Sequence, residues 1–468
     1  MLKHVLGLIF SVTVPLSLGC SGGVIDGGGT GDGDGGTGGG GPIGCVGRGC
    51  NVNTNCPSNL GPTTLTGTVR IPAGTLPLYN AKVYIPSGEP PSAPTSGASC
   101  LLCDQVVPSD AVTSTVTDIN GNFKLTNVPH GTDIPLVIRV GKWQRVVTIP
   151  AVQECATTPL DATMTRLPRN KSEGNIPQIA LSTGGADALE CLLRSKKLGL
   201  DDTEFTTDKG NGRVHLFAGG SSAVNNTQGA NKFAANLNGG ATFTSSNPWW
   251  DQAANLSKYD IVVLSCEGDQ LASTKSTNAR AALQTYINSG GRVFASHWHN
   301  YWIAGAPAPL NTVATFVGNG GGTNFNNPIT ADINITPAFT KGVALADWLQ
   351  LPDVGGTTTR GKLVINNARI TINTLNQSLT QTWVTYNNNG TVTPQYFSFN
   401  APVGAPATAQ CGQMVFTDMH VSGSSTGDTS SPGTAFPGGC VTNSLSAQEK
   451  ALIFMLFDLT NCLQPQVG

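Results

Sequence analysis

Tyr259-Asp-Ile-Val-Val-Leu264 is an almost unbroken apolar run, which is typical of a parallel strand that is covered on both faces. Residues 277–289 then carry apolar side chains at helical spacing, and Gly290-Gly291 can end a helix without backbone strain. Arg292–Ala295 is a second apolar run. A strand, a helix and another strand in this order predict an α/β fold with a mainly parallel sheet.

The same alternation continues on both sides of this unit. We predict further strands at 176–181, 214–218 and 413–417, and a helix at 186–195. A last helix begins after the capping box Ser446-Ala-Gln-Glu449. We therefore assign residues 172–463 to one α/β domain. Residues 305–410 are rich in Asn, Thr and Gly and hold strand-like pieces, which predicts a large β-rich insertion or an extra β layer.

Residues 61–168 have a different pattern. They hold short apolar or alternating runs, which lie at 65–71, 81–85, 112–117, 122–125, 134–140 and 144–149. Asn120-Gly121 separates two of these runs and tolerates the positive φ angles of a tight hairpin. Several short strands with Gly and Pro turns and no helical spacing predict a β-sandwich.

Residues 1–20 have the features of an export signal: a basic start, an apolar stretch and small residues before Cys20. The apolar stretch is too short to span about 30 Å of hydrocarbon. The segment resembles a bacterial lipoprotein signal, and an ordinary cleaved signal is the alternative. The resemblance implies lipidation of Cys20 and a place in the cell envelope, at the outer membrane or cell surface, because Ser21 follows the cysteine. The Gly-rich residues 21–60 predict a flexible tether.

Composition narrows the choice of partners. Charged residues make up 12% of the 468 residues and the net charge is −2, so we expect no nucleic-acid partner.

Of the 12 cysteines, eleven remain besides Cys20, and in an oxidising compartment most should form disulfides. Their odd number leaves at least one unpaired. We expect local pairs, among Cys45, Cys50 and Cys56 and between Cys100 and Cys103.

Polar and aromatic side chains follow three of the predicted strands at their carboxyl ends, where open parallel sheets bind ligands. In chain order they are Ser265, Cys266, Glu267 and Asp269, then Ser296, His297, Trp298, His299, Tyr301 and Trp302, then Asp418 and His420. We expect these three segments to meet at one edge of the sheet and to form a crevice there.

Three stretches of the sequence resemble the class I glutamine amidotransferase-like fold, which has a flavodoxin-like architecture, and within it the ThuA-like proteins. They are residues 259–264, 283–297 and 415–420. Amidotransferases hold a nucleophilic cysteine in a Gly-x-Cys-x-Gly turn after the strand that corresponds to 292–295. Here Ser296 and His297 occupy that place and the glycines are absent. His420 matches the late histidine of both groups, but Ser422 replaces the acid of amidotransferases. The resemblance therefore implies the fold and a link with sugar metabolism, without glutaminase activity.

A second resemblance, to the carboxypeptidase regulatory-like (transthyretin-like) domain, is carried by residues 66–69, 81–84, 117–123 and 128–131. Such domains lack catalytic residues and act as spacers, stabilisers or weak binding modules. Residues 87–110 form an insertion relative to that family.

The strand-end residues support more than one chemistry. His297, His299 and His420 are ligand types for zinc, and Glu267 or Asp269 would then act as general base on a metal-bound water. The alternative is that these side chains only bond to one another and to loop backbone. Cys266 could be a nucleophile, as could Ser296 with His420 as its base, although no nucleophile motif surrounds Ser296. For Cys266 we favour a disulfide or a buried thiol.

Two functions remain open, and the sequence does not decide whether the protein is an enzyme. The first is a lipid-anchored surface protein, binding or structural, that recognises a polysaccharide or another envelope component. Its expected ligand-binding residues are Trp298, Trp302, Tyr301 and Asp269. The second is a metal- or histidine-dependent hydrolase that uses His297, His420, Asp418 and Glu267. A third, weaker interpretation makes the β-sandwich the functional module, docked on another envelope protein.

Overall fold

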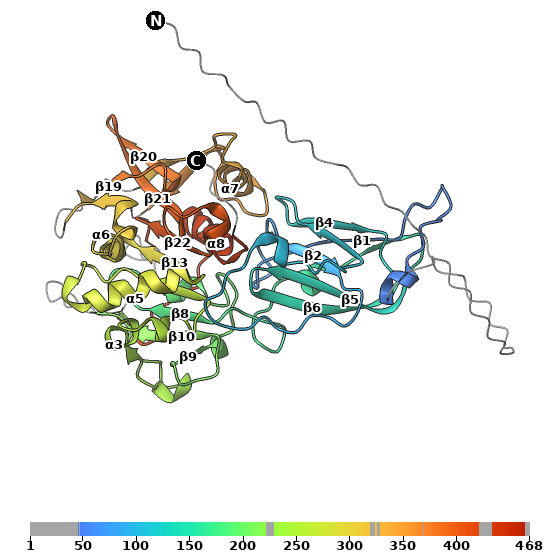
Figure 1. The fold of residues 1–468 in the computed structure, drawn as a ribbon, viewed down its shortest axis with the longest axis horizontal. Coiled ribbons are helices and arrows are strands. Elements are labelled where there is room, and N and C mark those ends of the chain that lie inside the picture. The colour runs from blue at the N-terminus through green and yellow to red at the C-terminus, as the bar shows by residue number, and fades with distance from the viewer. Residues whose placement is uncertain are drawn as a thin grey trace, which may run out of the picture. The chain divides into compact units, whose positions relative to one another are not determined.

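The computed structural model describes residues 45, 47–220, 229–318, 323–324, 328–366, 368–420 and 433–463 (Figure 1). The predictions for the export signal, for Cys20 and for residues 21–44 of the tether lie outside these residues. Within the described residues, no helix combines the length and the apolar character that a membrane span needs.

The N-terminal part of the described chain contains two facing sheets, as the alternating runs predict. One sheet has the order β4-β1-β7 and the other the order β3-β2-β5-β6. Leu65 and Phe123 of the first sheet share a hydrophobic core with Val83 and Ile138 of the second. The strands are β1 (Thr64–Thr68), β2 (Lys82–Ile85), β3 (Thr113–Val116), β4 (Asn122–Thr126), β5 (Gly131–Val140), β6 (Trp143–Val152) and β7 (Thr157–Pro159), and the short helix α1 (Ala162–Thr165) follows them.

An 11-stranded sheet forms the larger part of the structure, in the order β11-β10-β8-β12-β13-β22-β21-β20-β16-β17, with β9 paired to β10. Strands from β11 to β22 in this order run parallel. Their bounds are β8 (Ile179–Ser182), β9 (Phe205–Thr206), β10 (Val214–Ala218), β11 (Thr244–Ser245), β12 (Ile261–Leu264), β13 (Arg292–Ser296) and β22 (Gly412–Thr417). The sheet is thus mainly parallel, as the apolar runs predict.

The interval 305–410 enlarges this sheet in two ways. Four antiparallel strands continue it edge to edge beyond β22: β16 (Ile329–Ile333), β17 (Lys362–Ile365), β20 (Gln381–Asn388) and β21 (Thr391–Ala401). Two small ribbons add to them, formed by β14 (Ala314–Phe316) with β19 (Ile372–Leu375) and by β15 (Thr323–Asn324) with β18 (Arg369–Ile370). Phe316 packs against Phe416 at 5.4 Å between ring centroids, so the first ribbon lies on one face of the sheet.

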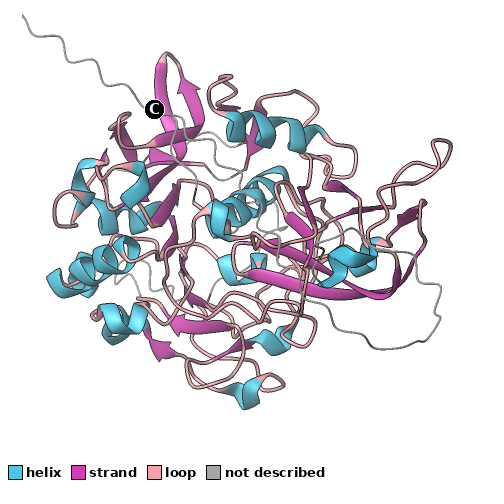
Figure 2. Cartoon of the chain, turned by 45° about the vertical axis from the view of Figure 1, so that its right-hand side comes forward, coloured by secondary structure: helices cyan, strands magenta, loops and turns pink. Residues whose placement is uncertain are grey.

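Helices cover both faces of the parallel strands. Val262, Val293 and Met414 pack in the core that contains the apolar side of α5, whereas Val263, Phe294 and Val415 pack in the core that contains α8. This alternation explains the continuous apolar runs in the strands. The helices are α2 (Leu189–Leu192), α3 (Ser246–Trp250), α4 (Ala253–Leu256), α5 (Thr277–Asn288), α6 (Tyr301–Ala304), α7 (Thr340–Gln350) and α8 (Ala447–Thr460), joined by long loops (Figure 2).

The helix predicted at 186–195 is shorter in the structure, where α2 covers only Leu189–Leu192. The chain turns back directly after it. The N–H of Leu198 donates to the carbonyl of Leu192 at 3.0 Å, and that of Gly199 to the carbonyl of Arg194 at 2.9 Å. These bonds use carbonyl groups that a longer helix would need, so helical spacing alone overestimated its length.

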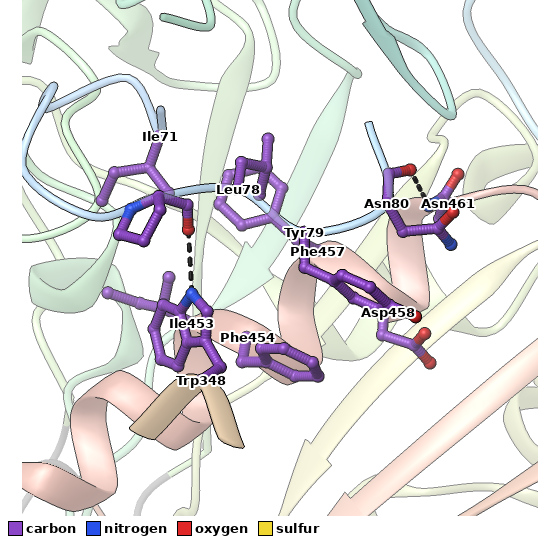
Figure 3. Close-up of a pocket in the computed structure, with 11 residues that line it drawn as sticks. Ile71, Leu78, Tyr79, Asn80, Trp348, Ile453, Phe454, Phe457, Asp458 and Asn461 are labelled. Carbon is purple, nitrogen blue, oxygen red and sulfur yellow. Dashed lines mark hydrogen bonds between the residues drawn. The ribbon is translucent and has the colours of Figure 1, made fainter. Parts of the chain in front are cut away.

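The loop at 71–80 of the β-sandwich packs against α7 and α8 (Figure 3). The indole N–H of Trp348 donates to the Pro77 carbonyl at 2.9 Å, and Tyr79 stacks on Phe454 with 6.2 Å between ring centroids. These contacts line a small pocket between the two parts, and Ile71 and Asn461 belong to its lining.

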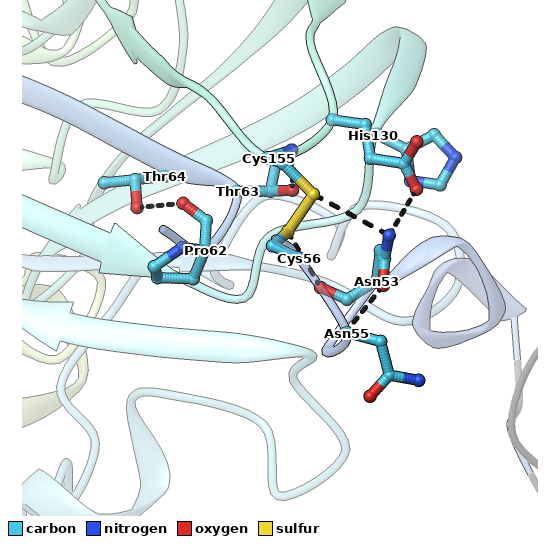
Figure 4. The surroundings of a disulfide bond; sticks show 9 residues. Asn53, Asn55, Cys56, Pro62, Thr63, Thr64, His130 and Cys155 are labelled. Carbon is cyan, nitrogen blue, oxygen red and sulfur yellow. Dashed lines mark hydrogen bonds and ion pairs between the residues drawn. A yellow bond between two sulfur atoms is a disulfide. The ribbon is translucent and has the colours of Figure 1, made fainter. Parts of the chain in front are cut away.

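Five disulfides link the described cysteines, and the expectation of local pairing is only partly correct. Cys45 pairs with Cys50 as expected. Cys56 pairs instead with Cys155, which ties the chain before β1 to the loop after β6 (Figure 4). The expected Cys100–Cys103 pair is wrong, because these residues bond to Cys411 and Cys462. Cys191 pairs with Cys440. Among the described cysteines Cys266 alone is free, in agreement with the odd count.

Candidate functional site

The carboxyl ends of β12, β13 and β22 lie side by side in the parallel sheet. Leu264 is opposite Ala295, and Ser296 is opposite Thr417, so the segments that follow these strands start at one edge. This register brings Cys266, His297 and His420 together, although 154 residues separate the first from the last (420 − 266).

Cys266, His297 and His420 form a compact buried group, which we call the Cys-His-His cluster. The Sγ of Cys266 lies 3.3 Å from Nδ1 of His297, and the two imidazole centroids are 4.8 Å apart. One ligand-type atom from each residue lies within 4.8 Å of the other two. The exposed fractions are 0% for Cys266, 4% for His297 and 2% for His420.

His297 has an unusual backbone conformation. Its φ angle is +46°, in the left-handed region, which costs a residue other than glycine on the order of 1–2 kcal/mol. It follows the last residue of β13 directly and begins a short 3₁₀-helix, His297–Asn300, that leads into α6. The chain therefore makes a sharp strand-to-helix turn directly after β13, and His297 stands at the start of this turn.

Burial governs the protonation of the cluster. It raises the pKa of the Cys266 thiol to about 12, so the sulfur keeps its proton at neutral pH. Burial also lowers the pKa of His420 to about 3 and that of His297 well below its ordinary value, and the charge of Arg369 adds to both shifts. Both imidazoles are therefore neutral. The Nε2 atom of each has no hydrogen-bond partner among the described residues.

His299, expected as a third metal ligand, lies outside the cluster. Its Nε2 is 2.8 Å from the carbonyl oxygen of Ser265, and the indole N–H of Trp302 donates to its Nδ1 at 3.0 Å. Because Nδ1 accepts this bond, Nε2 must carry the proton and donate to Ser265. Both ring nitrogens are thus occupied, and Cys266 takes the place that the sequence analysis gave to His299.

The two carboxylates expected in catalysis are held by other partners. Asp418 accepts hydrogen bonds from the N–H and hydroxyl of Thr371 at 2.9 and 2.6 Å, and burial raises its pKa to about 7. Glu267 forms an ion pair with Lys275 at 2.6 Å. Burial alone would raise the pKa of Glu267, but the charge of Lys275 lowers it on balance. Neither carboxylate belongs to the Cys-His-His cluster.

The predicted ligand-binding aromatics divide into two groups. Trp302 is buried in the core beside Trp250, with 5.0 Å between ring centroids, and the ammonium of Lys275 lies near both rings. Trp298 and Tyr301 are only partly buried. Asp269 is partly exposed as well.

A pocket that sequence reasoning did not locate lies beside α3, α4 and β10, with a volume of about 250 Å³. Its apolar wall consists of Phe217, Trp249 and Tyr259, where Trp249 stacks on Phe217 at 4.1 Å. Its polar residues are Asp208, Thr244, Asn255 and Lys258. The two adjacent tryptophans Trp249 and Trp250, after Pro248, are the sequence feature that could have indicated this pocket. The sequence does not show that Asp208 and Lys258 lie beside them.

Comparisons with known proteins add little beyond the fold. The sequence matches no protein-family profile and no curated protein. A solved structure described as a ThuA-like protein from Bacteroides uniformis is similar at 11% identity and a TM-score of 0.32, over 60% of this chain and 91% of that one. A type II cohesin–X-dockerin complex from Acetivibrio cellulolyticus is similar at 17% identity and a TM-score of 0.16, over 27% of this chain and 79% of that one. Similarity at this level assigns no family.

Proposed function

We propose that the protein is an exported, lipid-anchored envelope protein that binds a small carbohydrate-like ligand in the pocket of Trp249 and Tyr259. Five disulfides among the described residues support export to an oxidising compartment. The anchor rests on Cys20 and its resemblance to lipoprotein signals. The expected partners are the membrane, through the lipid, and an envelope polysaccharide or a related component.

The observation that carries this proposal is a buried, unpaired donor on Trp249, a residue that lines the pocket. Trp249 is 6% exposed, and its indole N–H has no hydrogen-bond partner among the described residues. An unpaired buried donor is unfavourable by about 1–3 kcal/mol, which a ligand oxygen would recover. Tyr259 stands nearby, held by His215 Nδ1 at 2.9 Å from its hydroxyl. Aromatic faces and edges suit the C–H surfaces of a sugar ring.

The polar residues of the pocket match hydroxyl groups. One carboxylate oxygen of Asp208 accepts a bond from the Thr244 hydroxyl at 2.6 Å, and this contact fixes the carboxylate at the pocket. Lys258 is exposed beside it and supplies a donor. Acceptors and donors next to an aromatic wall are the groups that orient a small polar ligand in a pocket.

The hydrolase alternative has less support in the geometry. Glu267 is paired with Lys275, Asp418 is held by Thr371, and Cys266 is fully buried with a protonated thiol. Activation of a nucleophile needs a free base within hydrogen-bond reach of an accessible attacking group. Among the described residues at the strand ends, no accessible nucleophile has a free base within hydrogen-bond reach. Binding is therefore the better supported function.

Calorimetric titration tests the binding function. The probes are glucose, galactose, N-acetylglucosamine and soluble peptidoglycan fragments, added to the full-length protein. Trp249→Phe keeps an aromatic ring beside Phe217 but removes the five-membered ring of the indole with its N–H, and it should weaken binding at least about tenfold, the value of one hydrogen bond. Trp298→Phe, outside the pocket, is the matched control and should bind like the wild type. Absence of binding to every probe, or equal binding by both variants, would refute the proposal.

Fractionation of cells that express the full-length protein tests the lipid anchor. The full-length protein should appear in the detergent-extracted membrane fraction, and Cys20→Ala should lose membrane attachment. Retention of Cys20→Ala in the membrane fraction would refute lipid anchoring without affecting the test of ligand binding.

A further inference from the structure

We propose that the Cys-His-His cluster is a binding site for one copper ion. It offers one sulfur and two imidazoles at the junction of three strand ends, the donor set of trigonal copper sites in proteins. This inference does not depend on ligand binding in the pocket of Trp249.

The distances between donors fit a shared ion. Bonds of about 2.3 Å to sulfur and 2.0 Å to nitrogen, about 120° apart in a trigonal site, place the two donors about 3.7 Å apart. Sγ of Cys266 and Nδ1 of His297 are 3.3 Å apart, which is within about 0.5 Å of this spacing. The third donor, from His420, lies within 4.8 Å of the others, and a closure of about 1 Å by side-chain rotation brings it into the same coordination sphere.

The surroundings of the cluster supply independent evidence. The buried Nε2 atom of His420 has no hydrogen-bond partner among the described residues, and such atoms are rare unless something else bonds to them. His297 is held at a φ angle of +46°, and strain of this kind persists at sites where the surrounding structure imposes it for function. Cys266 stays reduced while the other described cysteines form disulfides.

Burial and coordination number favour copper(I) over zinc. The three residues of the cluster are buried, and a net charge in a buried site is unfavourable. A copper(I) ion with one thiolate adds no net charge, whereas zinc with one thiolate adds one. Structural zinc also takes four protein ligands, and the cluster offers three. On binding, the S–H bond of Cys266 breaks, the sulfur bonds to copper and its proton leaves to solvent.

Metal reconstitution tests this assignment. The folded full-length protein is incubated with copper(I) without oxygen, desalted and measured for metal content. We expect one copper per chain and a higher unfolding temperature, because an ion that binds only the folded state stabilises it. Cys266→Ser and His420→Gln should each lower the affinity at least about a hundredfold, more than loss of a supporting residue does. His130→Gln, on the β-sandwich, is the control.

Three outcomes would overturn the copper assignment. The first is that the wild-type protein retains no copper. The second is that Cys266→Ser retains as much copper as the wild type. The third is that the protein binds zinc in place of copper and that Cys266→Ser and His420→Gln weaken this zinc binding. If a variant fails to fold, a measurement on the wild-type protein alone still tests the copper assignment. Copper should then protect Cys266, the free thiol among the described residues, from alkylation during partial unfolding in urea. Equal alkylation with and without copper would contradict the proposal.

Discussion

Glu190 lies buried in α2, and its Oε2 atom has no hydrogen-bond partner among the described residues. Burial, with a smaller contribution from the charge of Asp187, raises the pKa of this carboxyl from 4.5 to about 8. The side chain is therefore mostly protonated at neutral pH in the folded protein, whereas the unfolded chain releases the proton. Folding stability must then depend on pH through this one residue.

The sign of this dependence follows from the raised pKa. The stabilisation is complete below about pH 4.5 and is lost as the pH rises towards 8, by about 1.4 kcal/mol per pH unit. Glu190→Gln, which resembles the protonated form, should thus gain stability over the wild type progressively across this range. Urea unfolding of both proteins at several pH values measures the difference. A difference independent of pH would contradict the assignment.

Individual site residues were predictable only in part. His297 and His420 follow apolar strand runs, so the rule for parallel sheets placed them at one edge. The direction of a side chain beyond that edge depends on contacts that the sequence does not show. His299 turns away because Trp302 and the Ser265 carbonyl hold its ring. Cys266 joins the cluster because His297, which lies 3.3 Å away from its sulfur, follows the neighbouring strand β13 directly.

At the scale of elements, α8 begins as its sequence predicts. The Ser446 hydroxyl accepts a bond from the Glu449 N–H, and the Glu449 carboxylate accepts one from the Ser446 N–H at 2.8 Å. Ser446→Ala should lower the free energy of unfolding by about 1 kcal/mol, the usual value of an N-cap. Chemical denaturation measures it, and Ser446→Asp should restore most of the loss. An unchanged Ser446→Ala midpoint would show that packing alone fixes this helix end.

Elements with a strong apolar pattern were predictable, and those set by distant contacts were not. The strand predicted at 214–218 coincides with β10, and 413–417 differs from β22 by one residue. Both are buried, so their apolar character identified them. The hairpin of β20 and β21 carries many Thr and Asn residues and owes its place to pairing with β22. Sequence pattern indicated strands in this interval but not the sheet that they join.

At the scale of the whole molecule, two disulfides connect the insertion of the β-sandwich to the α/β part. Removing Cys103–Cys462 by serine substitution should destabilise the protein by about 2 kcal/mol more than removing Cys45–Cys50. The first pair spans 359 residues and the second spans 5, and the entropy of loop closure grows with length. The difference stays modest because Cys100–Cys411 already shortens the loop. Thermal unfolding of both variants measures it, and equal losses would contradict this account.

The crossed pairing of Cys100 and Cys103 also has a consequence for biogenesis. Cys103 precedes Cys462 by 359 residues in the chain, whereas Cys100 is only three positions away. During synthesis Cys103 can therefore form a non-native bond with Cys100 before Cys462 has been made. The yield of correctly bonded protein should then depend on the thiol–disulfide exchange that the host compartment provides.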